Sequence, residues 1–93
     1  MMQTKVNLDQ KLLKKVATMP PMIGRKLAFW IEAVAHQGLK EVRKIPGYHD
    51  EPLRGKRAGQ RSIRLNKAYR AIYVEVKGEP IVVEIIEVSK HQY

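Results

Sequence analysis

Hydrophobic residues recur at helical spacing near the start of the chain. The first stripe predicts a helix that is capped by Asn7 or Asp9 and runs through Thr18, and its members are Leu8, Leu12, Leu13 and Val16. Immediately before this helix, the apolar and polar residues at positions 5–8 alternate in a way that predicts a short first strand.

A second apolar stripe follows the Pro20-Pro21 pair, and its members are Ile23, Leu27, Trp30 or Ile31, and Val34. Proline is tolerated in the first turn of a helix but not in its interior, so this pair ends one helix and begins the next. Gly38 is a natural stop for the second helix. The pattern therefore predicts a helical hairpin, whose apolar stripes must be buried against another layer of structure.

The last third of the chain has the pattern of β-strands. Residues 60–66 alternate, with Ile63 and Leu65 on one side and Ser62 and Arg64 on the other. Segments 69–76 and 81–88 are rich in β-branched and aromatic residues, and a plausible hairpin turn at 77–80 joins them. Residues 81–88 are apolar on both faces, which predicts a strand inside the sheet rather than at its edge.

Helices followed by strands predict an α+β fold, with the helical hairpin packed on one face of a mainly antiparallel sheet. The connection at residues 39–60 holds two prolines and three glycines, so we expect it to be loop-rich. With 93 residues there is material for one core, and we expect a single domain over residues 1–93.

Composition excludes several classes of protein. The chain has no Cys, which rules out disulfides, thiolate metal sites and thiol nucleophiles. No apolar run approaches the roughly 20 residues that span a bilayer, so a membrane protein is excluded. The first residues also lack the apolar segment of a secretory signal. We therefore expect a cytoplasmic protein.

Positive charge is the most informative feature of the composition. Eighteen Lys and Arg residues face nine Asp and Glu residues, which gives a net charge of +9 and a pI near 10.0. Between residues 40 and 70 there are ten basic residues and three acids. Such a concentration predicts a binding face for a polyanion, either a nucleic acid or an acidic protein. The expected RNA contacts are Arg54, Lys56, Arg57, Arg61, Lys67 and Lys90.

Tyrosines add a second element of nucleic-acid recognition, because aromatic rings stack on unpaired bases. The candidates are Tyr48, Tyr69, Tyr73 and Tyr93. Among them Tyr73 lies in the middle of a predicted strand, which favours a place in the core over a role as a stacking platform.

The residues available for catalysis favour acid–base chemistry. Two serines without suitably spaced His and Asp partners make a catalytic triad a poor prediction, and the adjacent His49-Asp50-Glu51 does not suggest a metal site. We expect neither a metal nor a cofactor. Glu51 is a candidate base, Arg64 and Arg70 are candidates to hold a phosphate, and His91 or Tyr93 is a candidate proton donor. This set suits RNA cleavage by the 2′-hydroxyl, as one option among several.

Four segments, taken in order, resemble the RelE/ParE superfamily of bacterial toxins from type II toxin–antitoxin modules. They are 51–55 (EPLRG), 62–65 (SIRL), 69–73 (YRAIY) and 90–93 (KHQY). The resemblance implies a short strand, two helices and an antiparallel sheet. It also implies a ribosome-dependent endoribonuclease, or mRNA interferase, whose partners are mRNA, the ribosome and a cognate antitoxin that is acidic or has a helix-turn-helix.

The same resemblance implies roles for individual residues. Glu51 matches the glutamate of the Glu-Pro-Leu-basic-Gly segment in YoeB-like toxins, Arg70 matches the arginine of the Tyr-Arg strand, and Arg64 falls at a basic position in the preceding strand. The C-terminal segment supplies the general acid. YoeB-like chains end in His-Tyr, whereas Gln92 intervenes here, so the choice between His91 and Tyr93 stays open.

Two alternatives remain beside the endoribonuclease. A ParE-like toxin would poison DNA gyrase without the RNase residues, and the joint presence of a glutamate, two strand arginines and a terminal His/Tyr argues against it. A non-catalytic RNA-binding module would need only the basic face.

Overall fold

The computed structural model describes residues 4–90, and in them the helices precede the main strands as expected. The regular elements are β1 (Thr4–Leu8), α1 (Gln10–Ala17), α2 (Pro21–Gln37), α3 (Leu39–Val42), β2 (Glu51–Pro52), β3 (Arg61–Arg64), β4 (Tyr69–Val76) and β5 (Ile81–Lys90). Two single turns of 3₁₀ helix, η1 (Pro46–Tyr48) and η2 (Gly55–Arg57), lie in the connection before β3. Within residues 4–90, no helix is both long and apolar enough to cross a membrane.

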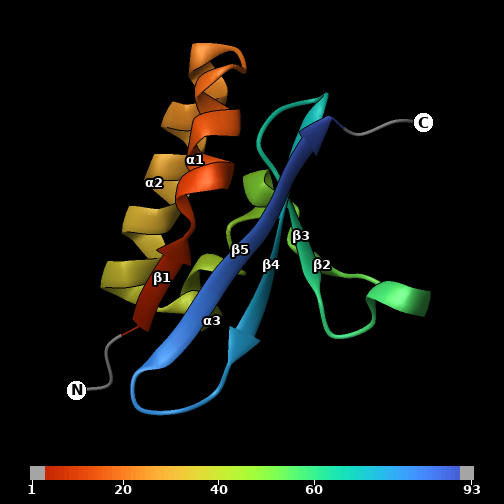
Figure 1. Ribbon diagram of the computed structural model, residues 1–93. Helices are drawn as coiled ribbons and strands as arrows, with labels where there is room; N and C mark the ends of the chain where they lie inside the picture. The colour runs from red at the N-terminus through yellow and green to blue at the C-terminus, as the bar shows by residue number, and fades with distance from the viewer. Residues whose placement is uncertain (1–3, 91–93) are drawn as a thin grey trace.

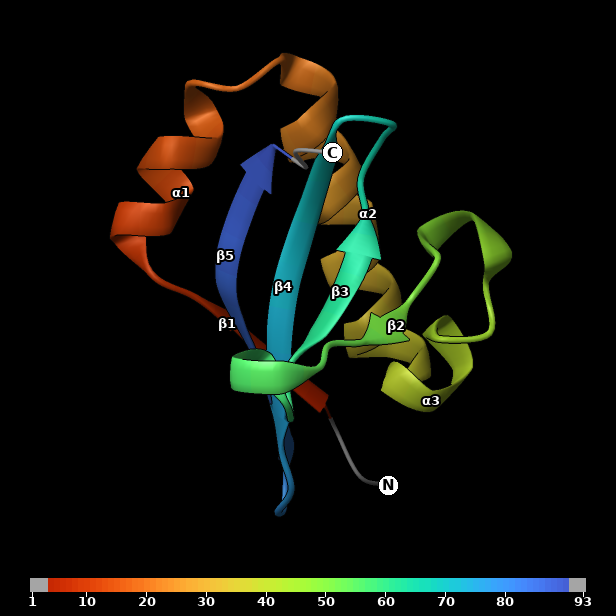
Figure 2. The ribbon, with the colours of Figure 1, turned by 90° about the vertical axis from the view of Figure 1, so that its right-hand side faces the viewer.

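The strands form one five-stranded sheet in the order β1-β5-β4-β3-β2. All neighbours are antiparallel except β1, which pairs in parallel with β5. Helices α1 and α2 lie together on one side of the sheet (Figure 1). Turned by 90°, the molecule shows its other face, which η2 crosses in front of β4 (Figure 2). The predicted α+β fold is therefore confirmed, with its helical hairpin on one face of a mainly antiparallel sheet.

The core lies between α2 and the sheet. Ile23, Leu27, Trp30 and Val34 of α2 are all buried, as the stripe predicted. Trp30 packs against Tyr73 of β4 with ring centroids 5.0 Å apart. Tyr73 is 1% exposed, so its predicted place in the core is confirmed. Full burial of an aliphatic side chain such as Ile23, Leu27 or Val34 stabilises the fold by about 1.5–3 kcal/mol.

Helix α1 is capped by Asp9, whose Oδ1 accepts a hydrogen bond from the Leu12 backbone N–H at 2.7 Å. This start places Val16 in the core and Leu12 half-buried against it. Leu13 was predicted to share that stripe, and this was wrong, because its side chain is 51% exposed. One residue further along a helix is a rotation of about 100°, which turns Leu13 away from the sheet.

Two further expectations are confirmed, and the structure adds detail to each. The connection at 39–60 is loop-rich, and it also contains the short helix α3, in which Leu39 and Val42 are buried, and the edge strand β2. Strand β5 is inside the sheet as predicted, between β1 and β4. Ile85 is buried, whereas Ile86 on the opposite face is 43% exposed, because only one face is covered by helices.

Candidate functional site

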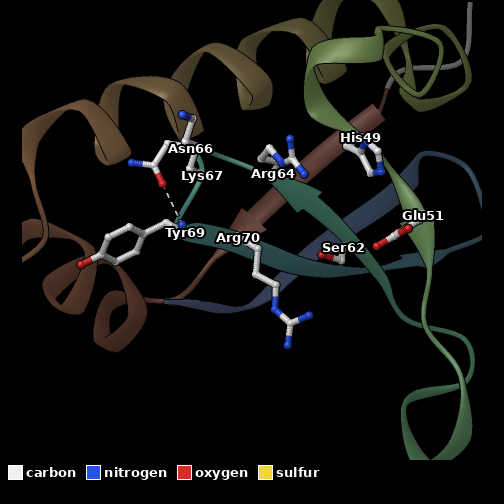
Figure 3. A pocket seen from close by; sticks show the side chains of 8 residues that line it. All are labelled: His49, Glu51, Ser62, Arg64, Asn66, Lys67, Tyr69 and Arg70. Atoms are coloured by element: carbon white, nitrogen blue, oxygen red, sulfur yellow. Dashed lines mark hydrogen bonds between the residues drawn. The ribbon is translucent and has the colours of Figure 1, made fainter. Parts of the chain in front are cut away.

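A hollow of about 150 Å³ opens on the face of the sheet that the helices do not cover. Figure 3 shows its lining, which comprises His49, Glu51, Ser62, Arg64, Asn66, Lys67, Tyr69 and Arg70. Three of the five predicted catalytic residues meet here, namely Glu51, Arg64 and Arg70. The other two, His91 and Tyr93, lie outside the described residues.

Strand register explains why these three side chains converge. Glu51 of β2 is paired with Ser62 of β3, and Arg64 of β3 is paired with Arg70 of β4. Side chains two residues apart on a strand share a face, so Ser62 and Arg64 point the same way. Paired residues on neighbouring strands also share a face, which places Glu51 and Arg70 beside them.

Arg70 has a feature that suits an anion. Its Nε is buried and has no hydrogen-bond partner among the described residues. Buried polar groups are nearly always paired, so this unpaired N–H on a residue that lines the hollow indicates a place for an acceptor. Arg64 is exposed, and within residues 4–90 neither arginine has an ion-pair partner within 4.0 Å. The hollow thus presents two guanidinium groups that no described carboxylate contacts directly, and guanidinium groups bind carboxylate or phosphate well.

Glu51 supplies the opposite charge at the same hollow. Its side chain is exposed and lies toward Ser62 at the edge strand (Figure 3). No ion pair within 4.0 Å ties it to a described cation. The carboxylate is therefore available to accept a proton from a bound molecule.

The turn between β3 and β4 is shaped by Asn66. Its Oδ1 accepts hydrogen bonds from the backbone N–H groups of Ala68 and Tyr69, both at 2.7 Å, and the bond to Tyr69 is drawn in Figure 3. This side-chain turn fixes the start of β4, where Tyr69 packs against the core and the next residue, Arg70, faces the hollow side of the sheet. Strand β5 ends at Lys90, which is paired with Tyr69.

The predicted RNA contacts fall into two groups. Arg54, Lys56, Lys67 and Lys90 are exposed, and they have no ion-pair partner within 4.0 Å among the described residues. Arg57 and Arg61 are instead bound to acids. Arg57 Nη2 lies 2.6 Å from Glu87 Oε1, and Arg61 Nε lies 2.6 Å from Asp50 Oδ1. Counting charges along the sequence does not reveal which cations are already paired.

The Arg57–Glu87 pair fastens η2 to the outer face of the sheet, where η2 crosses in front of β4 (Figure 2). Burial alone would raise the pKa of Glu87, but hydrogen bonds from Ser89 and Arg57 and the charges of Arg57 and Arg70 outweigh it. The net effect is a lowered pKa. Glu87 is thus a stable anion between the two arginines.

A buried network beside Glu51 was missed by sequence reasoning. Asp50 accepts hydrogen bonds from Arg61 Nε at 2.6 Å and from the Tyr73 hydroxyl at 2.5 Å. Its side chain is 1% exposed. The sequence signal for this network was the place of Asp50 inside the most basic stretch of the chain, because an acid there has several arginines with which it can pair. Within residues 4–90, no group of three acidic or His side chains is arranged to hold a metal ion.

Comparison with known proteins identifies the class of fold. No protein-family model matches the sequence, and no curated protein matches it. Solved structures do match over nearly the whole chain, and several of them are described as toxins or as toxin–antitoxin complexes.

A YoeB/ParE toxin from Agrobacterium tumefaciens is 20% identical, covers 98% of this chain and 100% of that one, and gives a TM-score of 0.66. A chain of the YoeB–YefM complex from Staphylococcus aureus is 15% identical, with 99% of each chain covered and a TM-score of 0.66. A chain of the DinJ–YafQ complex from Escherichia coli is 17% identical, with 98% of this chain and 94% of that chain covered and a TM-score of 0.65. The chain therefore has the RelE/YoeB-type toxin fold, which confirms the resemblance at the level of the fold.

Proposed function

We propose that this chain is the toxin of a type II toxin–antitoxin module and that it acts as an endoribonuclease on mRNA at the ribosome. The observation that carries the proposal is the hollow that Glu51 lines together with Arg64 and Arg70, two arginines that no described acid contacts within 4.0 Å. That hollow lies on the open face of a fold shared with YoeB and YafQ toxins. A net charge of +9 supports a polyanionic substrate.

Three residues of the hollow have a place in the proposed RNA cleavage. Glu51 takes the proton of a 2′-hydroxyl, whose oxygen then attacks the adjacent phosphorus and displaces the 5′-oxygen of the next nucleotide. The phosphoryl oxygens gain negative charge in the transition state, and Arg64 and Arg70 stabilise it. The leaving 5′-oxygen receives a proton from His91 or Tyr93, and the products are a 2′,3′-cyclic phosphate and a 5′-hydroxyl. This route needs no metal, no cofactor and no protein nucleophile.

Residues at the rim of the hollow would hold the RNA strand. Lys67 lines the hollow, and the exposed cations Arg54, Lys56 and Lys90 would neutralise phosphates further along the strand. This arrangement predicts strong salt dependence of RNA binding, because neutralised phosphates release their counterions.

An antitoxin is part of the same proposal. The solved structures of the same fold include the complexes YoeB–YefM and DinJ–YafQ. By analogy, a cognate antitoxin, acidic or with a helix-turn-helix, would neutralise the basic face of this chain in the cytoplasm. Complementary charge would make the encounter fast and salt-dependent.

Cleavage of translated mRNA by the purified protein is the direct test. Replacing Arg70 or Arg64 by Ala should lower the single-turnover rate by about 10²–10³-fold, as the loss of a preorganised charge-stabilising donor does elsewhere. Lys15→Ala is the matched control, because it removes an exposed cation from α1 on the helical side. Unchanged cleavage in both arginine variants would refute the site. A wild-type protein that binds RNA without cutting it would indicate a binding module, and one that inhibits DNA gyrase would indicate a ParE-like toxin.

A further inference from the structure

The strand that carries Glu51 is a weak element when taken alone. Strand β2 has two residues, Glu51 and Pro52, and both are exposed. Proline has no N–H to donate to the sheet, so the ladder between β2 and β3 is short of hydrogen bonds. The preceding His49 has a φ of 50°, in the left-handed region that non-glycine residues seldom adopt. Backbone pairing is therefore insufficient to hold Glu51 in one place.

Asp50 supplies the missing anchor. Its carboxylate is almost fully buried and takes one hydrogen bond from Arg61 on β3 and one from Tyr73 on β4. Arg61 and Tyr73 are themselves directly paired across the two strands. One side chain thus fastens the edge segment to both inner neighbours at once.

The anchor points are themselves held firmly. The Tyr73 hydroxyl accepts a hydrogen bond from Arg43 Nε at 3.3 Å, and Arg43 Nη2 lies 3.1 Å from Glu75 Oε1. The Tyr73 ring packs on Trp30 in the core. Asp50 is therefore bound to groups whose positions are fixed by the helices and by the middle of the sheet.

We propose that Asp50 is the positioning residue of Glu51, and that Arg61 serves the site through Asp50 rather than by holding RNA. Successive residues of an extended segment point to opposite faces, so a carboxylate fixed on the core side directs the next side chain to the open face. A slip of one residue would reverse both directions and remove Glu51 from the hollow. The inference rests on the proposed function, in which Glu51 is the base.

The geometry separates this role from a direct RNA contact. Arg61 donates its Nε–H to the buried Asp50, and its side chain is 27% exposed. Arg54 and Lys56 are instead exposed and have no ion-pair partner among the described residues. A cation that binds phosphate contributes to affinity and to the salt dependence of binding. A cation that acts through Asp50 contributes to the rate of cleavage only.

A double-mutant cycle tests the proposal on the full chain. Asp50→Asn keeps the size of the side chain but removes the charge that holds Arg61, and it should lower single-turnover cleavage by about 10²-fold, the usual cost of a 1 Å misplacement. In a Glu51→Gln background the same change should have less than about a 3-fold effect, because the group that it positions is already gone. Arg61→Gln should behave like Asp50→Asn, with the dissociation constant for a non-cleavable single-stranded RNA within about 2-fold of wild type.

Controls distinguish positioning from a general loss of structure. Val34→Ala removes volume from the core at α2, at a residue that does not line the hollow, and should leave cleavage unchanged at temperatures where the variant is folded. The positioning role would be overturned if the losses in cleavage rate caused by Asp50→Asn and Glu51→Gln combined in full in the double variant. An Arg61→Gln variant with weakened RNA binding and a reduced salt slope would also overturn it, as would full cleavage by Asp50→Asn. A wild-type protein that cuts no RNA would instead overturn the proposed function, and the positioning role of Asp50 with it.

Discussion

Removing the Tyr73 hydroxyl should change how the stability of the protein depends on pH. The hydroxyl donates to Asp50 at 2.5 Å and accepts from Arg43 at 3.3 Å, and the residue is 1% exposed. Burial, with the hydrogen bond to Asp50 next in importance, raises the pKa of Tyr73 from 10.0 to about 12. A phenol that ionises later in the folded state than in the unfolded state makes the protein sensitive to alkali.

The sign and size of this effect follow from linkage. Below pH 10 the phenol is neutral in both states, so its full contribution to stability is present. Above pH 10 the unfolded chain ionises first, and the free energy of unfolding falls by about 1.4 kcal/mol per pH unit. A difference of two pKa units therefore corresponds to a total loss of about 3 kcal/mol by pH 12. Lys residues titrate in the same range, so only the difference between wild type and Tyr73→Phe isolates this group.

Urea denaturation of wild type and Tyr73→Phe between pH 8 and pH 11.5 measures that difference, followed by far-UV circular dichroism and by fluorescence of Trp30, the only Trp. At pH 8 the Phe variant should be less stable by about 1–3 kcal/mol, because Asp50 and Arg43 each lose a hydrogen-bond partner. Above pH 10 the two proteins should converge, because only wild type loses stability through this phenol. A difference that stays constant from pH 8 to pH 11.5 would refute the reasoning.

Two further changes should act on stability in ways that the structure specifies. Glu87→Gln removes the carboxylate that binds Arg57. Because the fold lowers the pKa of Glu87, the contribution of this carboxylate to the free energy of unfolding is present above about pH 4.5 and is lost as the pH falls through the lowered pKa. The difference from wild type should therefore be below about 1 kcal/mol at pH 7, since the pair is partly exposed, and should vanish in acid denaturation series. Gly38→Ala should cost about 1–3 kcal/mol in urea denaturation, because Gly38 has a φ of 86° after the end of α2. Gly47→Ala is the control, since Gly47 has no such backbone angle and open space around it, and a loss equal to that of Gly38→Ala would contradict the explanation.

The periodicity of apolar residues predicted the elements that are long enough to repeat a buried position several times. The buried face of α2 and the limits of β4 followed from the spacing of apolar residues alone, because a regular element presents one face to a single layer. The same logic failed for Leu13, where a difference of one residue in phase separates core from solvent. It also failed for α3, since one turn of helix is too short to show a period.

The sequence predicted which residues form the candidate site better than it predicted how they are arranged. Glu51, Arg64 and Arg70 were chosen partly by resemblance, and the structure places all three around one hollow. The role of Asp50 depends on two partners 11 and 23 residues away in sequence. No local pattern specifies which arginine meets which acid, because that pairing is decided by strand register.

Charge pairing decides which arginines of the basic stretch are available to a ligand. Asp50 and Glu87 each bind one of these arginines, and none of the four paired residues lines the hollow. Arg61 and Arg57 are thereby held in place as parts of the scaffold, while the hollow itself keeps Arg64 and Arg70 without an acid bound to either among the described residues. A phosphate must displace any acid that already contacts an arginine, whereas at Arg64 and Arg70 it displaces none among the described residues. The two acids thus remove Arg57 and Arg61 from the cations that are available to a ligand, and they leave Arg64 and Arg70 available in the hollow beside Lys67.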